Sequence, residues 1–243
     1  MKKQWFAMAM VLVLCMAVTA YQEQKIEKSF PADGKISRID LANINGAITV
    51  FTQAADRFDI KAIKSSDRDG ELEAVDILFE TAGDQLKVRL DQKRKPNHVK
   101  VSFEVKVPRN VKQAVFQSVN GGITAKGSFS DLNLETVNGA IHCEGNFSES
   151  VLATVNGGVE VMVEEPLMGN LLVKTVNGGI DIELNRKSGF TLNGKTMNGG
   201  IDSDFNLSVD KGFVGSRIFG TVNDGLRKIE LKTINGAISI SEI

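Results

Sequence analysis

The sequence predicts an all-β protein: a single-chain parallel β-solenoid (a β-helix, with a right-handed coil expected) that carries a β-rich N-terminal insertion or cap. The main evidence is a short phrase, Asn-Gly followed by Gly or Ala and then Ile or Val, that occurs seven times. Its Asn residues are Asn45, Asn120, Asn138, Asn156, Asn177, Asn198 and Asn235. From Asn120 the steps are 18, 18, 21 and 21 residues. Units of about 20 residues are too short for ankyrin or tetratricopeptide repeats and fit one turn of a β-solenoid.

The N-terminus reads as a secretory signal peptide over residues 1–20. Lys2 and Lys3 precede an apolar run at residues 5–14, and small residues at 18–20 suit a cleavage site. The run is too short for an ordinary membrane-spanning helix, and no second run of this kind follows. We therefore expect an exported protein, periplasmic, envelope-associated or extracellular, with no transmembrane span in the mature chain.

The two cysteines of the sequence are Cys15 and Cys143. Cys15 hints at a lipidation site, but Leu14 before it is not the small residue that such a site requires, so cleavage is favoured over lipidation or a retained anchor. After cleavage only Cys143 remains, which excludes an intrachain disulfide. Cys143 occupies a predicted inward column and is expected to be a small buried hydrophobe.

Beyond the signal peptide we divide the chain at residue 110. Residues 21–110 hold the first coil and the β-rich cap, and residues 111–243 hold the repeat array. Alternating runs in the cap are 58–64, 77–80, 86–90 and 99–107, with a hairpin turn predicted at residues 82–84. Residues 206–228 form a smaller interruption that is rich in Gly and Asn turn signals.

Alignment on the Asn residues predicts the strands of each coil. Apolar residues recur six and four positions before the Asn, and again three and five positions after it, which is the period of a strand with one buried face. Another apolar residue stands immediately before each Asn, and Thr or Ser usually stands two before it. Because the step from minus four to minus one is odd, we expect a bend at the Thr, beside an Asn-Gly pair that tolerates positive φ. We expect the stacked Asn side chains to form a structural hydrogen-bonded ladder at a buried corner.

Two outward columns are candidate functional positions. Four residues after the Asn, Glu160, Asp181 and Asp202 would form an acidic strip if the coils stack in register. Three residues before the Asn, Lys174, Lys195 and Lys232 would form a basic stripe able to hold an anionic polymer. The acidic strip could serve glycoside chemistry or bind calcium, but a solvated, mixed surface is the simpler interpretation of both columns.

Composition narrows the function classes. The 29 Lys and Arg residues nearly balance the 30 Asp and Glu residues, which gives no electrostatic footprint for nucleic acid. With His98 and His142 in unrelated contexts, no zinc site can be assembled. No nucleophile elbow, phosphate loop or dinucleotide fingerprint is present. We therefore expect no cofactor, no metal and no catalytic residues.

The recurring Thr-Val-Asn-Gly-Gly-Ile phrase, with Phe30-Pro31, Val105-x-Val107-Pro108 and the closing segment 229–236, resembles a bacterial family of unknown function whose members are named "putative adhesin". The resemblance covers roughly residues 28–243 and implies an extracytoplasmic β-solenoid.

These observations favour a non-enzymatic, envelope-associated interaction or scaffolding surface that binds an unknown protein or polysaccharide. End-to-end self-association through exposed strand edges is a further expectation. The alternative is a polysaccharide-acting β-helix enzyme that uses Glu160, Asp181 and Asp202. A third hypothesis is an adhesin that is stabilised by bound calcium.

Overall fold

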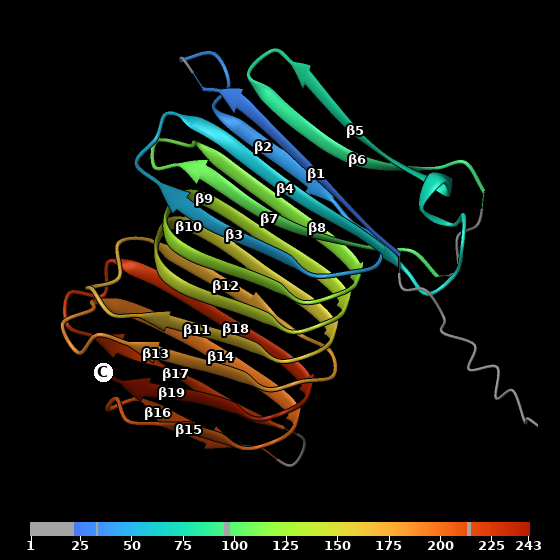
Figure 1. Cartoon of the computed structure of the whole chain (residues 1–243). Helices are drawn as coiled ribbons and strands as arrows, with labels where there is room; N and C mark the ends of the chain where they lie inside the picture. Colours follow the sequence, from blue (N-terminus) through green and yellow to red (C-terminus); the bar gives the residue numbers. More distant parts are fainter. Residues whose placement is uncertain (1–21, 33, 95–97, 213–214) are drawn as a thin grey trace, which may run out of the picture.

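The computed structural model describes residues 22–32, 34–94, 98–212 and 215–243, so the predicted signal peptide at residues 1–20 lies outside it. The described residues form a tall stack of β-strands with one short 3-10 turn, η1 (Leu72–Ala74) (Figure 1). No helix among them has the length and apolar character needed to cross a bilayer.

The strands alternate along the chain with short corners and turns. The first eight are β1 (Gln22–Pro31), β2 (Arg38–Ala42), β3 (Ile48–Gln53), β4 (Arg57–Ser66), β5 (Val75–Ala82), β6 (Gln85–Gln92), β7 (Lys100–Pro108) and β8 (Gln113–Asn120). The others are β9 (Ile123–Asn138), β10 (Ile141–Asn156), β11 (Val159–Val163), β12 (Asn170–Lys174), β13 (Ile180–Leu184), β14 (Phe190–Asn198), β15 (Ile201–Ser203), β16 (Ser208–Lys211), β17 (Ser216–Val222), β18 (Arg227–Asn235) and β19 (Ile238–Glu242).

The repeat strands build two walls that meet at the Asn-Gly corners. Wall A holds the residues before each Asn, in the order β2, β8, second half of β9, second half of β10, β12, β18, β14. Wall B holds the residues after each Asn, in the order β3, first half of β9, first half of β10, β11, β13, β19, β15. All these pairs are parallel, as a solenoid requires.

Two long strands show how one wall continues into the other. Each of β9 and β10 runs along wall B and then along wall A. They bend at Gly127 and Gly145, which are paired in register and have φ values of 122° and 129°. Glycine is needed there because other residues rarely adopt such φ values.

The order of the coils in space differs from their order in the sequence. β18 lies between β12 and β14, and β19 lies between β13 and β15. The coil of Asn235 therefore sits between the coils of Asn177 and Asn198. The chain first builds the outermost coil (β14 and β15), returns through the antiparallel strands β16 and β17, and then fills the gap with β18 and β19.

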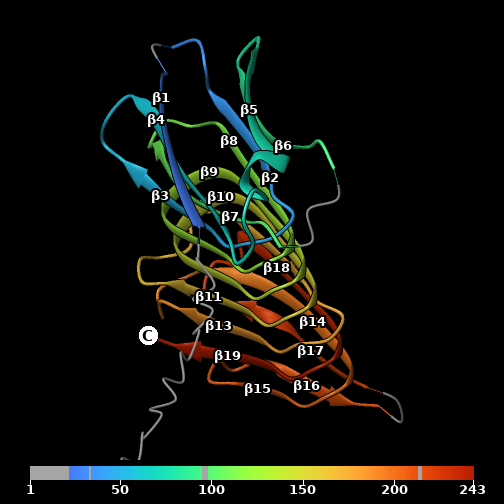
Figure 2. The ribbon, with the colours of Figure 1, turned by 45° about the vertical axis from the view of Figure 1, so that its right-hand side comes forward.

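Strands outside the Asn-Gly coils extend both ends of the stack (Figures 1 and 2). β7 and β6 join the walls in parallel, whereas β4, β1 and β5 at the N-terminal end and β17 and β16 at the other end add antiparallel strands. At the N-terminal end β7 pairs with β3, β4 with β7, and β1 with β4, while β6 pairs with β2. β5 and β6 form the predicted hairpin, turning at Gly83 with φ 61°. The runs predicted in the cap therefore correspond to β4, β5, β6 and β7.

The core is a continuous stack of apolar side chains between the two walls. The columns predicted six and four positions before the Asn are buried, for example Ile39, Leu41, Leu132 and Leu134. The columns three and five positions after the Asn are buried as well. Phe58, Phe116, Phe147 and Phe190 are the largest fully buried side chains. Each such side chain contributes about 1.5–3 kcal/mol by leaving water, so the inner columns account for much of the stability.

Candidate functional site

The Asn-Gly corner is held by a ladder of side-chain hydrogen bonds that runs the full height of the repeat stack. Each Asn Nδ2 donates to the Oδ1 of the next Asn over distances of 2.7 to 2.9 Å, in the order Asn198, Asn235, Asn177, Asn156, Asn138, Asn120, Asn45. These bonds lie at the surface, whereas the sequence suggested a buried corner. All of them point in one direction: Asn198 only donates to the ladder and Asn45 only accepts from it. The Asn45 end therefore presents an Nδ2 donor, and the Asn198 end presents an Oδ1 acceptor.

A second ladder lies inside the corner and corrects the predicted bend. The Thr two positions before the Asn is buried, and its Oγ1 donates to the carbonyl of the corner Gly on the neighbouring coil. The pairs are Thr136 to Gly121, Thr154 to Gly139, Thr175 to Gly157, Thr233 to Gly178 and Thr196 to Gly236, at 2.8 to 3.0 Å. The alternation therefore continues through the Thr without a change of phase, and the chain turns after the Asn.

The first coil of the stack departs from this arrangement. Asn43 replaces the Thr, and its Nδ2 donates to the carbonyls of Gly46 and Val101 at 2.9 and 2.8 Å. On the next coil the buried Oγ of Ser118 has no hydrogen-bond partner among the described residues. By the pattern of the other coils Ser118 would donate to Gly46, and Asn43 already occupies that carbonyl.

The corner glycines are required mainly for close packing. A Cβ on the first Gly of a phrase would collide with the carbonyl of the same Gly on the adjacent coil, except at Gly46, where it would collide with the carbonyl of Val101 on β7. Among the corner glycines that the structure describes, only Gly46 has a positive φ (119°), so the tolerance of Asn-Gly for positive φ is used at one corner. The second residue of the phrase has more room: at Gly158 the nearest atom to an added Cβ is 3.6 Å away, and Ala already stands at this position as Ala140.

The register of wall B separates the predicted acidic strip. Glu160 pairs with Asp181, but Asp181 pairs with Ser239, and Ser239 pairs with Asp202. The expectation of three carboxylates on successive coils is therefore corrected, because Ser239 intervenes between Asp181 and Asp202. Glu160 and Asp181 line a shallow depression of about 350 Å³.

The neighbours of this strip are ion pairs near the surface. His142 Nδ1 lies 3.2 Å from Glu160 Oε2. Glu144 accepts a 2.6 Å hydrogen bond from Lys126, and this bond lowers the pKa of the Glu144 carboxyl, assisted by the nearby charge of the same lysine.

The Cys143 side chain points inward. Its burial, with a smaller effect of the Glu144 charge, raises the pKa of the thiol to about 12. Across residues 22–32, 34–94, 98–212 and 215–243, no three metal-ligating side chains converge.

The same register brings the predicted lysine column together on wall A. Lys174 pairs with Lys232, and Lys232 pairs with Lys195. Arg217, on the antiparallel β17, pairs with Lys195 and extends the row to four cations on four adjacent strands. Arg217 could not be found from the repeats because it lies outside them. We call Lys174, Lys232, Lys195 and Arg217 the cation row.

An anionic neighbour partly balances this row. Glu230 forms an ion pair with Lys232. The hydrogen bond from Lys232, together with the charges of Lys232, Lys174 and Lys195, lowers the pKa of Glu230. Asp210 on β16 pairs in register with Arg217, so two carboxylates adjoin the four cations and the row keeps a net positive charge.

Beside the cation row runs an exposed column of apolar side chains, which the sequence had suggested would point inward. It consists of the residue before each corner Asn, and in spatial order these are Ile44, Val119, Val137, Val155, Val176, Ile234 and Met197. Val119, Val137 and Ile234 are 41–42% exposed, Val155 is 38% exposed and Met197 is 53% exposed. Ile44 and Val176 are half-buried. They point outward because the neighbouring Thr points inward. We call them the apolar column.

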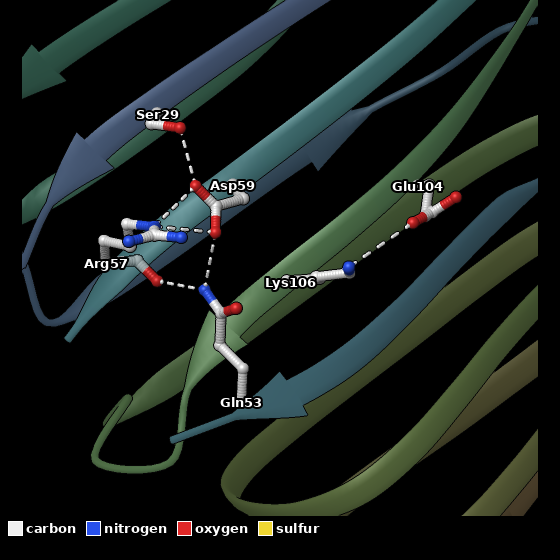
Figure 3. Close-up of polar contacts among 6 residues, drawn as sticks. All are labelled: Ser29, Gln53, Arg57, Asp59, Glu104 and Lys106. Atoms are coloured by element: carbon white, nitrogen blue, oxygen red, sulfur yellow. Dashed lines mark hydrogen bonds and ion pairs between the residues drawn. The ribbon is translucent and has the colours of Figure 1, made fainter. Parts of the chain in front are cut away.

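A polar cluster fixes the edge strand β1 to the N-terminal end of the stack (Figure 3). Asp59 on β4 accepts hydrogen bonds from Ser29, Gln53 and Arg57 at 2.6 to 3.0 Å. Burial alone would raise the pKa of Asp59, but these hydrogen bonds and the Arg57 charge lower it below its ordinary value. Ser29, Gln53 and Arg57 all bind the Asp59 carboxylate, so we assign the cluster the role of bracing β1 against β4.

Comparison with solved structures finds folds that are only broadly similar. A "putative cell adhesion protein" from Clostridium sporogenes ATCC 15579 is 10% identical, covers 91% of this chain and 100% of its own, and has a TM-score of 0.43. A "putative adhesin" from Bacteroides fragilis NCTC 9343 is 13% identical over 90% and 97%, with a TM-score of 0.45. A "putative lipid binding protein" from Parabacteroides distasonis ATCC 8503 is 12% identical over 92% and 96%, with a TM-score of 0.34.

These likenesses carry no argument about function, since their TM-scores lie below 0.5. No curated protein matches the chain. The family model described as Toastrack DUF4097 matches residues 1–241, which confirms the resemblance drawn from the Asn-Gly phrases. The chain therefore belongs to the Toastrack DUF4097 family.

Proposed function

We propose that the chain is a non-enzymatic, exported interaction module of the cell envelope, with an adhesin-like or scaffolding role. It docks a protein partner on the outward face of wall A. The observation that carries this proposal is the apolar column, in which five of the seven side chains are exposed and two are half-buried. The cation row lies beside the three coils of the column that hold Val176, Ile234 and Met197. At a strand spacing of about 4.8 Å, the column extends for about 29 Å. Soluble proteins seldom leave such a continuous apolar line in water without a use for it.

The chemistry of the column favours a protein partner. Its members are Val, Ile and Met, and none is aromatic. Proteins usually contact sugars and membrane interfaces through aromatic side chains, whereas flat aliphatic faces pack well against another protein surface. The cations beside the column would pair with carboxylates of that partner, which steers association and fixes its orientation.

The strand edges are less suited to docking than wall A. The outer strands of the stack are β1 and β5 at one end and β15 and β16 at the other. β15 and β16 have three and four residues, and β1 carries Lys25 and Lys28. Short edges and edge lysines are the means by which proteins resist strand addition. End-to-end self-association is therefore the weaker proposal.

The alternative, a polysaccharide-acting enzyme, has less support. It needs two carboxylates around one bond, and Ser239 separates Asp202 from Asp181. Glu160 and Asp181 still pair directly and line one depression, but the Glu160 side chain is 67% exposed and lies 3.2 Å from His142. A solvated face explains these groups without catalysis.

Binding of a defined probe tests the proposal. The probe is a fluorescent peptide of alternating Val and Glu, which matches the apolar column and the cation row, and its anisotropy is measured against protein concentration. Lys174→Glu/Lys232→Glu should weaken binding by roughly tenfold or more. The matched control, Lys28→Glu/Lys35→Glu, makes the same charge change at the far end of the stack and should leave binding unchanged.

Two other probes separate the partner classes. Phosphatidylglycerol vesicles and alginate offer a lipid surface and an anionic polysaccharide. Preference for either of these over the peptide would overturn the assignment to a protein partner. Equal peptide binding by the two double variants would overturn the assignment to wall A.

A further inference from the structure

A cavity of about 590 Å³ lies at the N-terminal end of the Asn ladder, on the opposite end of the stack from the cation row. It exists because β7 replaces the next coil at this point. Val101 N donates to the carbonyl of Asn45 at 2.7 Å and Phe103 N to that of Ala47 at 2.9 Å. β7 thus continues the backbone pairing of wall B but brings no Asn corner. The cavity occupies the position where a further rung of the ladder would stand.

The ladder presents a hydrogen-bond donor to this cavity. Asn45 accepts from Asn120 at 2.8 Å through Oδ1, and its Nδ2 has no acceptor among the described residues. Because the amides are aligned in a single direction, each bond polarises the next, and the partial charges sum as they do along a helix. The Nδ2 end at Asn45 is therefore the positive end, and it favours an anionic acceptor.

Other groups around the cavity suit the same ligand. Lys100 adds a cation, and the hydroxyls of Ser65 and Ser102 make no hydrogen bond within the described part of the chain. His98 Nδ1 lies 3.4 Å from Asp67 Oδ1, so the one carboxylate that lines the cavity is paired with a base. Asn45 Nδ2 and the Lys100 ammonium group can only donate, and the serine hydroxyls can also donate, so an oxyanion would find several donors. The volume is in the range of small-molecule sites.

We propose that this cavity binds a small hydroxylated oxyanion. A carboxylate or phosphate oxygen of the ligand takes the place of the missing Asn Oδ1, and accepts from Asn45 Nδ2 and Lys100. Hydroxyl groups of the ligand form hydrogen bonds with the hydroxyls of Ser65 and Ser102. Acidic sugars and sugar phosphates share this chemistry. The site does not depend on the docking face of wall A, so either proposal can fail alone.

Asn45→Asp is the decisive variant. The aspartate keeps an oxygen that accepts from Asn120 Nδ2, so the ladder remains intact, but it replaces the terminal donor with a negative charge. Lys100→Gln removes the cation from an exposed side chain and provides a second variant that does not touch the corner. Ser208→Asp is the control, since it adds the same charge on the edge strand β16 at the other end of the stack.

Calorimetric titration of each protein with glucuronate, glucose 6-phosphate and glucose gives the readout. We expect millimolar or tighter binding of at least one anion (on the order of 4 kcal/mol at 1 mM) and none of neutral glucose. Asn45→Asp should weaken binding by about tenfold or more, as expected for loss of a hydrogen bond to a charged group, and Ser208→Asp should not. Preference for one anion identifies the oxyanion. If neither anion binds, or if Asn45→Asp binds as well as the control, the proposal is wrong.

Discussion

The two glycines of one corner should respond to the same substitution in opposite ways. Gly157→Ala places a methyl group against the carbonyl of Gly139, inside van der Waals contact. That carbonyl also accepts the Thr154 hydroxyl at 2.9 Å, so the two coils must separate and this bond is lost. Gly158→Ala places the methyl 3.6 Å from the nearest atom, the carbonyl of Gly179.

The size of each effect follows from these contacts. Overpacking against backbone costs about 1–3 kcal/mol, and each hydrogen bond lost costs about 0.5–1.5 kcal/mol. Gly157→Ala should therefore lower the free energy of unfolding by about 1.5–4.5 kcal/mol. Gly158→Ala restricts the unfolded chain without a clash, and should leave the stability unchanged or raise it by about 0.4–1 kcal/mol.

Urea denaturation followed by far-ultraviolet circular dichroism measures both variants against the original protein. Because the stack is built from repeats, the transitions should be checked for equal slopes before free energies are compared. The close-packing explanation of the corner would be refuted if the free energy of unfolding of Gly157→Ala lay within about 0.5 kcal/mol of that of the original protein. It would also be refuted if both variants lost the same free energy of unfolding.

Three further outcomes follow from the ladders and the buried groups. Asn156→Ala removes two rungs and Asn198→Ala only one, so the former should lose about 1–3 kcal/mol and the latter about half of that in the same urea assay; equal losses would contradict the ladder. The lowered pKa of Asp59 stabilises the folded state above the ordinary value of 3.8, and this contribution is lost as the pH falls through the lowered pKa. Asp59→Asn should therefore weaken the loss of free energy of unfolding between neutral and acidic pH. An unchanged pH dependence would contradict the bracing role of the Asp59 cluster. Cys143, 1% exposed and with a pKa raised to about 12, should react with a thiol reagent at pH 8 only after unfolding; rapid reaction of the native protein would contradict its burial.

Periodicity predicted the inner columns because burial constrains every second residue of a strand. Ile39, Leu41, Ile48 and Val50 all lie in the core, as the spacing from Asn45 implied. Parallel stacking followed from the short repeat. The hairpin at Gly83 followed from its turn residues.

The orientation of the residue before each Asn could not be predicted from apolar character. Val137 was expected to point inward, yet Thr136 does so instead. A buried hydroxyl without a partner is costly, but the carbonyl of Gly121 satisfies it. That carbonyl belongs to the neighbouring coil, so its position depends on the fold and not on the local pattern.

The spatial order of the coils could not be predicted from the sequence either. The 37-residue step from Asn198 to Asn235 indicated an interruption, but not a return of the chain into the gap beside Asn177. That return makes Ser239 the neighbour of Asp181 and Lys232 the neighbour of Lys195. It therefore breaks the acidic strip and assembles the cation row, which is why the candidate site shifts from wall B to wall A.

Photo-crosslinking in the native envelope tests the proposed docking face most directly. A photoreactive amino acid is placed at Val155 on wall A and, in a matched variant, at Thr124 on wall B. We predict a discrete protein crosslink from position 155 that Lys232→Glu abolishes, and none from position 124. Crosslinks from position 124 alone, or a crosslink from position 155 that Lys232→Glu leaves unchanged, would contradict a docking face built from the apolar column and the cation row.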